Sequence, residues 1–279
     1  MQTENSLYDV IIIGGSYAGL SAALGLARNL CKVLIIDAGE RCNRNGLRAR
    51  GILTHDGVPP GEVAAEAREE VLKYKNVEFL NGSVVSTTKK NKIFEVTTEA
   101  KETFTGRKLL LSTGLKDKIL PIPGMAECWG RSAFHCPFIR GYEVAGQVLG
   151  VLVSDEKEIS SVLLIYHLSK NLKIFTNGQS NISPEWTNKF EKKEIPIIQS
   201  EIEKIEHENG QMKHLIIKDG SKHAIDAFFP RPPTEQHSSI PKELGCHLDE
   251  RGLIQVDEFY RTSVSGVFAT GDNVAIFRS

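Results

Sequence analysis

Residues 135–143 place a single cysteine where thiol redox chemistry would use two. The segment reads His-Cys-Pro-Phe-Ile-Arg-Gly-Tyr-Glu, and Cys136 is its only sulfur. In a C-x-x-C pair, one thiolate attacks the disulfide of a partner and the second resolves the mixed disulfide. Ile139 stands at the second position. Cys136 is therefore a catalytic candidate with two open roles, a mixed disulfide with a partner or a passive thiol, and the missing resolving thiol favours the passive one.

A glycine-rich turn near the amino terminus predicts a dinucleotide site. Residues 13–19 read Ile-Gly-Gly-Ser-Tyr-Ala-Gly, after a β-branched run and at the start of an apolar helical pattern. Backbone N–H groups and the helix dipole at such a turn can hold a pyrophosphate. Asp37 follows at the end of a second strand, where a carboxylate accepts hydrogen bonds from a ribose. The alternative is a plain tight turn, and the strand, helix and acidic residue together favour dinucleotide binding.

Ser16 departs from the G-x-G-x-x-G pattern, because it stands where the middle glycine lets backbone approach phosphate closely. A serine held in a left-handed conformation would cost about 1–2 kcal/mol. Its hydroxyl could also bind the phosphate. The departure at Ser16 therefore weakens the match to the pattern without breaking it.

The elements that must position these residues form two similar series. In the first series, a helix is predicted at 18–30 between strands at 9–13 and 32–37. A loop at 38–60 and a helix at 61–74 follow. Short strands then turn at 81–82, 90–91 and 105–106, and the series ends with a strand at 108–112. In the second, strands at 149–153 and 172–176 flank a helix at 156–169, and hairpins turn at 209–210 and 219–220. This order predicts an α/β fold of two Rossmann-like (βαβ plus β-meander) domains, joined by a linker at 115–124.

Composition excludes several classes of function. The chain has 279 residues and a formal net charge of -1, which gives no electrostatic case for nucleic acid or an anionic membrane. Residues 10–27 are apolar, but their glycines and polar residues favour a strand, turn and helix over a membrane span. The polar start does not resemble a secretory signal, and five scattered cysteines favour reduced thiols in the cytoplasm. No cysteine or histidine spacing indicates a metal site.

Four motifs carry a resemblance to a known family. They are residues 9–23, Leu-Leu-Leu-Ser-Thr-Gly at 109–114, residues 129–143, and Gly-Val-Phe-Ala-Thr-Gly-Asp at 266–272. In this order they resemble the low-molecular-weight, thioredoxin reductase-like members of the FAD-dependent pyridine nucleotide-disulfide oxidoreductases. The resemblance implies FAD as the first ligand and a homodimer. It also implies a discontinuous FAD-binding domain at 1–116 and 243–279, with a degenerate NAD(P)-binding-like domain inserted at 117–242.

The resemblance also implies roles for individual residues where the motifs match. The cofactor-binding candidates are Gly14, Gly15, Ser16, Ala18 and Gly19 at the pyrophosphate, Asp37 at the ribose, Val84 at the adenine, Thr113 and Gly114 beside the cofactor, and Asp272 at the ribityl or phosphate portion. A second group lies in the loop that approaches the flavin in this family. Each of these residues is as likely to contact the flavin as to belong to a solvated polar loop: Arg44, Asn45, Thr54, His55 and Asp56.

Three departures from the family separate this chain from a disulfide reductase. Ile139 replaces the cysteine nearest the flavin, and Arg140, which is not a usable general acid at neutral pH, replaces the acid that often follows it. The second glycine turn is replaced by Ser-Asp-Glu-Lys-Glu at 154–158, and the next strand ends without arginines for a 2′-phosphate. Seven residues follow Asp272 where the family has a helix, so we expect FAD to bind more weakly or with a more exposed ring.

These observations leave three hypotheses. The leading one is an FAD-binding oxidoreductase in which the flavin exchanges electrons with a small donor, oxygen or a protein such as ferredoxin or a thioredoxin-like protein, without a dithiol and without NADPH. The second is a catalytically silent flavin-binding pseudoenzyme or regulatory module. The third, which the departures disfavour most, is an NADPH-dependent thioredoxin reductase with an unusual centre.

Overall fold

The first strand–helix–strand unit forms as its sequence predicts. The computed structural model describes residues 7–44 and 46–275. Strand β1 (Tyr8–Ile13) pairs in parallel with β2 (Val33–Asp37), and helix α1 (Tyr17–Arg28) connects them. Both strands are rich in β-branched residues, and most of their residues are buried, as expected for parallel strands between two covered faces. The two strands end together, because Ile13 lies opposite Ile36.

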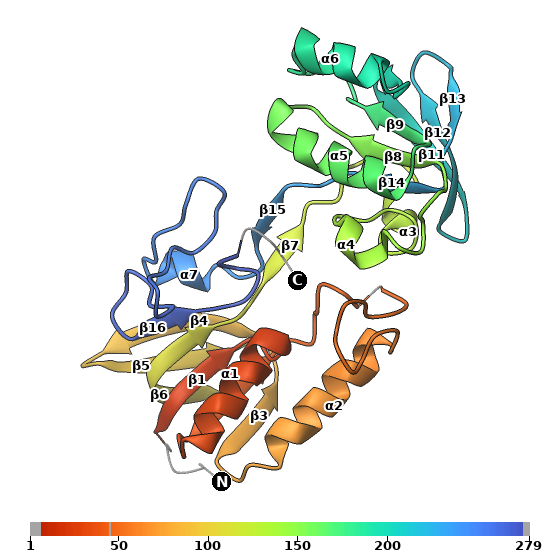
Figure 1. Cartoon of the computed structure of the whole chain (residues 1–279). Coiled ribbons are helices and arrows are strands. Elements are labelled where there is room, and N and C mark those ends of the chain that lie inside the picture. The colour runs from red at the N-terminus through yellow and green to blue at the C-terminus, as the bar shows by residue number, and fades with distance from the viewer. Residues whose placement is uncertain (1–6, 45, 276–279) are drawn as a thin grey trace. The chain divides into compact units, whose positions relative to one another are not determined.

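These strands belong to a seven-stranded sheet with the order β3-β2-β1-β6-β5-β4, in which β16 also pairs with β6 (Figure 1). The pairs β2/β3, β1/β2, β1/β6 and β6/β16 are parallel, while β4, β5 and the first half of β6 form an antiparallel meander. The remaining bounds are α2 (Pro60–Leu72), β3 (Val77–Asn81), β4 (Val84–Lys90), β5 (Ile93–Thr98), β6 (Thr103–Leu111), α7 (Ile240–Glu243) and β16 (Val267–Ala269).

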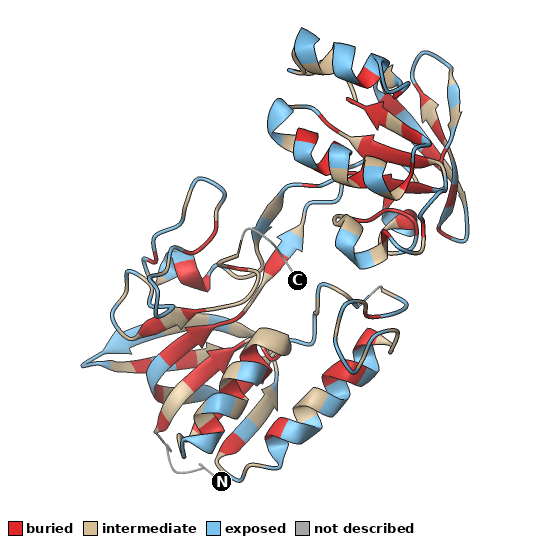
Figure 2. Cartoon of the chain, viewed as in Figure 1, coloured by how far each residue is buried: buried red, intermediate tan, exposed pale blue. Residues whose placement is uncertain are grey.

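Alternation along the strands divides the core of this sheet into two faces. Ile12 packs with the buried side chains of α1 and α2, such as Leu20 and Val71. Its neighbours Ile11 and Ile13 pack on the other face, in the cluster that holds Phe94 and Ile240. Figure 2 shows the resulting band of buried residues through the strands. Two covered faces leave the ends of the strands as the place for a ligand.

One sequence-based prediction in this region is wrong. The Thr105-Gly106 pair, predicted as a turn, lies inside β6, where Gly106 is paired with Tyr8 and Phe94. A Cβ atom at position 106 would lie 2.8 Å from Ile11 Cγ1. The glycine therefore serves close packing within the sheet. The chain turns earlier, after β5, where Lys101 has φ 64°.

The central part of the chain forms its own sheets. Four strands pair in parallel in the order β10-β9-β8-β14, and three pair antiparallel in the order β11-β12-β13. The hairpins turn at Asn209-Gly210 and Asp219-Gly220, as predicted. The bounds are α3 (Met125–Cys128), α4 (Pro137–Arg140), β8 (Leu149–Leu152), the 3₁₀ turn η1 (Glu156–Glu158), α5 (Ile159–Leu168), β9 (Leu172–Phe175), α6 (Pro184–Glu191), β10 (Ile197–Ile198), β11 (Ile202–Glu208), β12 (Gln211–Ile217), β13 (Lys222–Ala224) and β14 (Ala227–Phe229).

The chain groups into two compact units. The first unit comprises Met1–Arg44, Gly61–Asp117 and Thr234–Ser279, and the second comprises Asn45–Pro60 and Lys118–Pro233. The predicted linker at 115–124 is partly a strand, because β7 (Leu115–Asp117) pairs antiparallel with β15 (Thr234–Gln236). Apolar residues in these two segments are few, so their pairing left no strong periodic signal in the sequence. No helix within residues 7–44 and 46–275 is long and apolar enough to cross a membrane.

Candidate functional site

The predicted glycine turn lies at the carboxyl end of β1, where backbone packs against backbone. The Gly14 N–H donates to the Ile36 carbonyl at 2.9 Å. Gly14 has φ +105°, and a Cβ atom there would lie 2.3 Å from the carbonyl oxygen of Ser112. A side chain at this position is excluded both by conformation and by space. The turn is therefore built for close approach to the end of β6.

Ser112 holds this turn, although its position in the sequence did not mark it as a site residue. It is buried, and its Oγ lies 2.7 Å from the Gly14 carbonyl, to which the hydroxyl donates. Gly19 closes the other side, because a Cβ atom at position 19 would lie only 2.0 Å from the Gly14 oxygen. Helix α1 thus starts in direct contact with the turn. The signal available in the sequence was the serine within Leu-Leu-Leu-Ser-Thr-Gly.

Ser16 does not carry the cost of a left-handed conformation. Ser16 is the N-cap of α1, with φ -88° and ψ -166°, which is extended backbone open to any residue. Gly14 takes the left-handed conformation instead. The Ser16 side chain makes no capping hydrogen bond, and no acidic residue lies in the first turn of α1. The first turn of α1 therefore holds no carboxylate that could pair with the amide groups at the start of the helix. These amide groups are suited to binding an anion.

Asp37 lies beside the turn at the end of β2. Its Oδ1 accepts a hydrogen bond from the Gly15 N–H at 2.9 Å. A Cβ atom at Gly15 would lie 2.8 Å from the Asp37 Cβ and 2.9 Å from the Phe79 ring, so the carboxylate and the turn are in contact. Val84, the adenine candidate, begins β4 and packs half-buried against the core. The structure brings Asp37, Gly14, Gly15 and Gly19 together.

The ends of β6 and β16 complete this edge of the sheet. Leu111 pairs with Ile13 on one side and with Ala269 on the other, so the three strands stop in register. A Cβ atom at Gly271 would lie 2.9 Å from the Ala18 Cβ, which puts the Gly-Asp motif of Asp272 against the start of α1. The adjoining candidates, Thr113 and Gly114, follow β6 directly, and the Gly114 carbonyl accepts the His237 N–H at 3.2 Å.

Several polar side chains of the loop after β2 bind other residues of the same loop. Arg44 is exposed and donates to the Arg41 carbonyl at 2.9 Å. Asp56 is exposed and accepts hydrogen bonds from the Gly51 N–H at 2.9 Å and from Arg50 at 3.2 Å. Thr54 Oγ1 lies 2.9 Å from His55 Nδ1. Of the predicted loop candidates, Asn45 lies outside the described residues.

The loop is also tied to the segment that follows Cys136. Arg50 Nε lies 2.5 Å from Glu143 Oε1, and Arg140 lies 3.9 Å from the same oxygen. Both ends of this ion pair belong to the second unit. The arginine at position 140 therefore serves as a counter-ion for Glu143.

Cys136 is the N-cap of the short helix α4 and is half-buried. Ile139 lies one turn further on, and 36% of it is exposed. Its neighbours Phe138 and Tyr142 are 76% and 91% exposed. All five cysteines of the chain lie within the described ranges, and none of them is in a disulfide. The segment therefore holds one thiol on a partly exposed, apolar turn.

The thiols of this protein differ in burial, so we expect them to differ in reactivity. Cys128 and Cys246, which are buried, are expected to resist alkylation in the folded state. Burial raises the pKa of both thiols, which lowers their thiolate fraction at neutral pH. Cys42 is exposed and serves as the internal reference. Brief iodoacetamide treatment at neutral pH, followed by mass spectrometric mapping, checks this order. Equal labelling of Cys128 and Cys42 in the native protein would contradict it, and urea-unfolded protein provides the fully labelled control.

The start of the helical segment after β8 is occupied by carboxylates. Asp155 accepts the Lys157 N–H at 2.9 Å, and Glu158 accepts the N–H groups of Ser154 at 2.8 Å and of Asp155 at 3.4 Å. The side chains of Asp155 and Glu158 also form a capping box, in which each accepts from the backbone of the other residue. Glu156 accepts the Ser183 N–H at 2.9 Å. The amide groups that a phosphate would need at this position are already paired with negative side chains.

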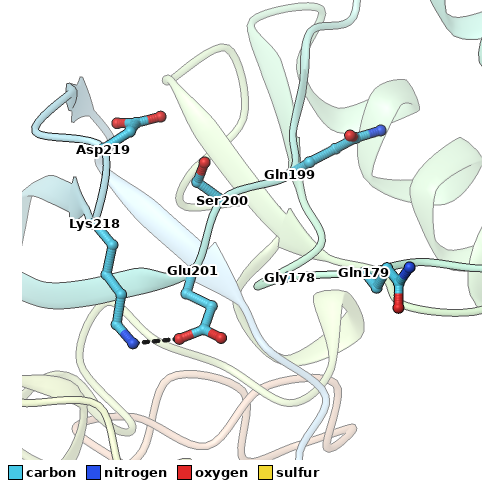
Figure 3. A pocket seen from close by; sticks show the side chains of 7 residues that line it. All are labelled: Gly178, Gln179, Gln199, Ser200, Glu201, Lys218 and Asp219. Carbon is cyan, nitrogen blue, oxygen red and sulfur yellow. Dashed lines mark hydrogen bonds and ion pairs between the residues drawn. The ribbon is translucent and has the colours of Figure 1, made fainter.

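The end of β9 opens onto a hollow of about 500 Å³ (Figure 3). It is lined by Gly178, Gln179, Gln199, Ser200, Glu201, Lys218 and Asp219. Lys218 is the single cation of this lining, and its Nζ lies 2.5 Å from Glu201 Oε2. Hydrogen bonding to Glu201 raises the pKa of Lys218, while hydrogen bonds from Ser221 lower the pKa of Asp219. Two carboxylates against one paired ammonium make this hollow unfavourable for a 2′-phosphate.

Comparison with known proteins finds similarity along the whole chain. The family described as pyridine nucleotide-disulphide oxidoreductase matches residues 8–278. Thioredoxin reductase tcpT of Claviceps purpurea is 33% identical over 292 residues, which cover 100% of this chain and 90% of the relative. Thioredoxin reductase sirT of Leptosphaeria maculans is 32% identical over 290 residues, with coverages of 98% and 88%. Among solved structures, the oxidoreductase from Agrobacterium tumefaciens has a TM-score of 0.92 and 31% identity, and the match covers 98% of this chain and 92% of that one.

Proposed function

Because the chain belongs to the pyridine nucleotide-disulphide oxidoreductase family and is thioredoxin reductase-like, we propose that it is an FAD-dependent oxidoreductase that works without a dithiol and without NADPH. Its fold is mixed α/β, with sheets like those of the solved relatives. In this proposal the first unit is a Rossmann-like domain that binds FAD, and the inserted second unit is a degenerate NAD(P)-binding-like domain.

The residues of the first unit fit FAD. Gly14, Gly15 and Gly19 leave a turn in which a Cβ atom would clash with backbone or neighbouring side chains, and the start of α1 offers amides to a pyrophosphate. Asp37 lies against this turn and would accept hydrogen bonds from the ribose through its second oxygen. Ser112 would hold the turn rigid by donating to Gly14. Bound FAD would supply the exchange of electrons with donors and acceptors, which no side chain of this site provides.

The absence of NADPH binding in this proposal rests on the carboxylates that cap the helix start at residues 155–158. A phosphate here would have to displace Asp155 and Glu158 from their amides and then lie near Asp155, Glu156 and Glu158. At about 4 Å, one such carboxylate opposes a negative charge by about 1 kcal/mol in water and about 4 kcal/mol near a protein surface. Micromolar binding amounts to only about 8 kcal/mol. The paired Lys218 at the other end of the site adds no compensating charge.

The segment after Cys136 supports the absence of dithiol chemistry. Ile139 cannot form a disulfide with Cys136, and Arg140 lies 3.9 Å from Glu143, where it acts as a counter-ion. Electrons would instead pass between the flavin and a small donor, oxygen, or a protein such as ferredoxin or a thioredoxin-like protein. We further propose a homodimer, as the family resemblance implies. In this account Cys136 is a passive thiol.

A second candidate function follows from the same observations. A single cysteine together with a blocked nucleotide turn also fits a catalytically silent flavin-binding pseudoenzyme or regulatory module. The two candidates differ in turnover. Steady reduction of a protein or small-molecule acceptor by the loaded protein with reduced ferredoxin favours the oxidoreductase, and a flavin that only dithionite reduces favours the silent module.

The proposal is tested first by FAD uptake. Purified protein is expected to carry flavin absorbance, or to acquire it when apoprotein is incubated with FAD and desalted. FMN serves as the comparison, because it lacks the adenosine half that Asp37 and Val84 are proposed to contact. Protein that lacks flavin and takes up neither compound would refute the proposed function.

A further inference from the structure

A groove on the second unit combines an aromatic floor with a rim of lysines. Its volume is about 320 Å³, and helices α5 and α6 (Figure 1) with the turn after α6 supply its lining, which is Leu163, Trp186, Lys189, Phe190, Lys192 and Lys193. The rings of Trp186 and Phe190 lie 5.8 Å apart, and 41% of Leu163 is exposed. None of these lining residues is acidic. An occupant of this α5–α6 groove must therefore combine an apolar group with a negative charge.

Two of the three lysines are free to bind a carboxylate. Lys189 is paired with Glu185 at 2.6 Å and lies over the Trp186 ring at 4.2 Å. Lys192 and Lys193 are exposed, and no carboxylate of the described residues lies within 4.0 Å of either ammonium group. Charges of one sign at the rim of a groove select a partner of the opposite sign.

A turn on the first unit has the complementary composition. Four aromatic side chains of the described residues are exposed, namely Phe138, Tyr142, Phe259 and Tyr260. Phe259 and Tyr260 are adjacent, with 61% and 54% exposed, and Glu258 before them has no described cation within 4.0 Å. The other pair is followed by Glu143, whose charge is already balanced by Arg50. Residues 257–260, the acidic turn, therefore offer an unpaired carboxylate beside two exposed rings.

Asp257 holds the acidic turn in one conformation. Its carboxylate accepts the N–H groups of Phe259 and Arg261 at 2.9 Å each, and Arg261 Nε at 2.8 Å. Tyr260 has φ 59°, a left-handed conformation that is costly for any residue with a Cβ atom. Such strain is concentrated at functional sites, binding sites included. A rigid turn loses little conformational entropy when it binds, which suits aromatic anchors at the centre of an interface.

We propose that the acidic turn of one copy of this chain docks into the α5–α6 groove of a second copy. Phe259 and Tyr260 then pack on the aromatic floor, where both copies remove apolar surface from water, and Glu258 pairs with Lys192 and Lys193. This inference rests on the homodimer proposed above, to which it assigns an interface, and does not depend on FAD. Each copy carries one turn and one groove, so two copies make the contact twice, as in a closed twofold dimer.

Charge reversal on each side tests the contact. Lys192→Glu with Lys193→Glu in one variant, and Glu258→Lys in another, are each expected to weaken self-association at least about tenfold, because like charges then meet. An equimolar mixture of the two is expected to recover it, since one contact is then native and the other has both charges reversed. Light scattering over a dilution series measures the association. Lys73→Glu with Lys75→Glu, which changes exposed lysines after α2 by the same net charge, is the matched control and should associate like the wild type.

Two further measurements locate the contact. A carbodiimide joins a carboxylate directly to a lysine amine, and a mixture of nitrogen-15-labelled and unlabelled wild-type protein is expected to give peptides of mixed isotope that link Glu258 to Lys192 or Lys193. Tyr260→Gly is expected to weaken association while the protein unfolds at an unchanged or higher temperature, because glycine adopts the left-handed conformation without strain. A merely structural role of Tyr260 would lower both.

A wild-type dimer whose dissociation constant is unchanged in both charge-reversal variants would overturn this interface and leave the homodimer intact. Links from Glu258 that form only within one chain would overturn it as well. A wild type that stays monomeric at every concentration would overturn the homodimer and the interface together, whereas failure to take up FAD bears on the proposed cofactor alone.

Discussion

A Gly19→Ala variant is expected to lose FAD affinity by about tenfold or more, equivalent to at least about 1.4 kcal/mol. The added Cβ atom would lie 2.0 Å from the Gly14 carbonyl oxygen and 2.8 Å from Ser112 Oγ. Backbone cannot yield like a flexible side chain, so the helix start must move away from the turn. We also expect the apoprotein to lose about 1–3 kcal/mol of unfolding free energy. Titration of apoprotein with FAD and urea unfolding measure the two effects.

Gly25→Ala in the same helix is the matched control. Gly25 lies in α1 and is exposed, and a Cβ atom added there would have no neighbouring atom within 4 Å. Alanine at this position is expected to stabilise the helix by about 0.5–1 kcal/mol and to leave FAD affinity unchanged. Equal FAD affinity in the two variants would show that the contact between α1 and the turn does not shape the cofactor site.

An Asp37→Ala variant is expected to bind FAD about ten- to a hundredfold more weakly. Asp37 accepts the Gly15 N–H at 2.9 Å, and in the proposed function its carboxylate also accepts from the ribose. Hydrogen bonds to a charged group contribute about 1.5–3 kcal/mol each. FAD titration of the apoprotein measures the loss, and FMN, which has no adenosine ribose, should show a smaller one.

Asp9→Ala separates cofactor binding from stability. Asp9 likewise accepts a backbone N–H, that of Lys32 at 2.9 Å, but near the amino end of β1 rather than its carboxyl end. Both variants remove a bond between a carboxylate and backbone, so both should lower stability. FAD affinity should fall in Asp37→Ala alone. A matching fall in Asp9→Ala would mean that Asp37 acts through the fold and not through the ligand.

Residues 9–37 could be read from the sequence because their signals are local. The β-branched runs, the glycines after Ile13 and the acid at Asp37 each predict one element, and the parallel register then brings their ends together. Ser16 shows the limit of such patterns. The motif has a glycine at its third position, whereas the structure has the positive φ at Gly14 and leaves Ser16 in extended backbone at the N-cap position of α1.

Other features depend on contacts between residues far apart in the sequence. Gly106 resembles a turn residue by type, but its role is to make room for Ile11 across the sheet. Ser112 matters because its hydroxyl reaches Gly14, 98 residues earlier. No periodicity in a single sequence reports such pairings.

The carboxylates at residues 155–158, in contrast, have a role that a local signal in the sequence predicts. Acidic residues in the first turn of a helix are a local signal, and the sequence predicts that they satisfy the helix start themselves. The capping box of Asp155 and Glu158 is that arrangement in detail. That this cap excludes NADPH is the central claim of the proposed function, because the matching family is described as pyridine nucleotide-disulphide oxidoreductase.

The most direct test of this claim is anaerobic absorbance spectroscopy of the FAD-loaded protein during titration with NADPH, then NADH, then reduced ferredoxin, with dithionite as the final reductant. We predict that the flavin stays oxidised and keeps its absorbance band with both pyridine nucleotides, and that dithionite reduces the flavin and bleaches the band. Stoichiometric bleaching by NADPH within seconds would contradict the account.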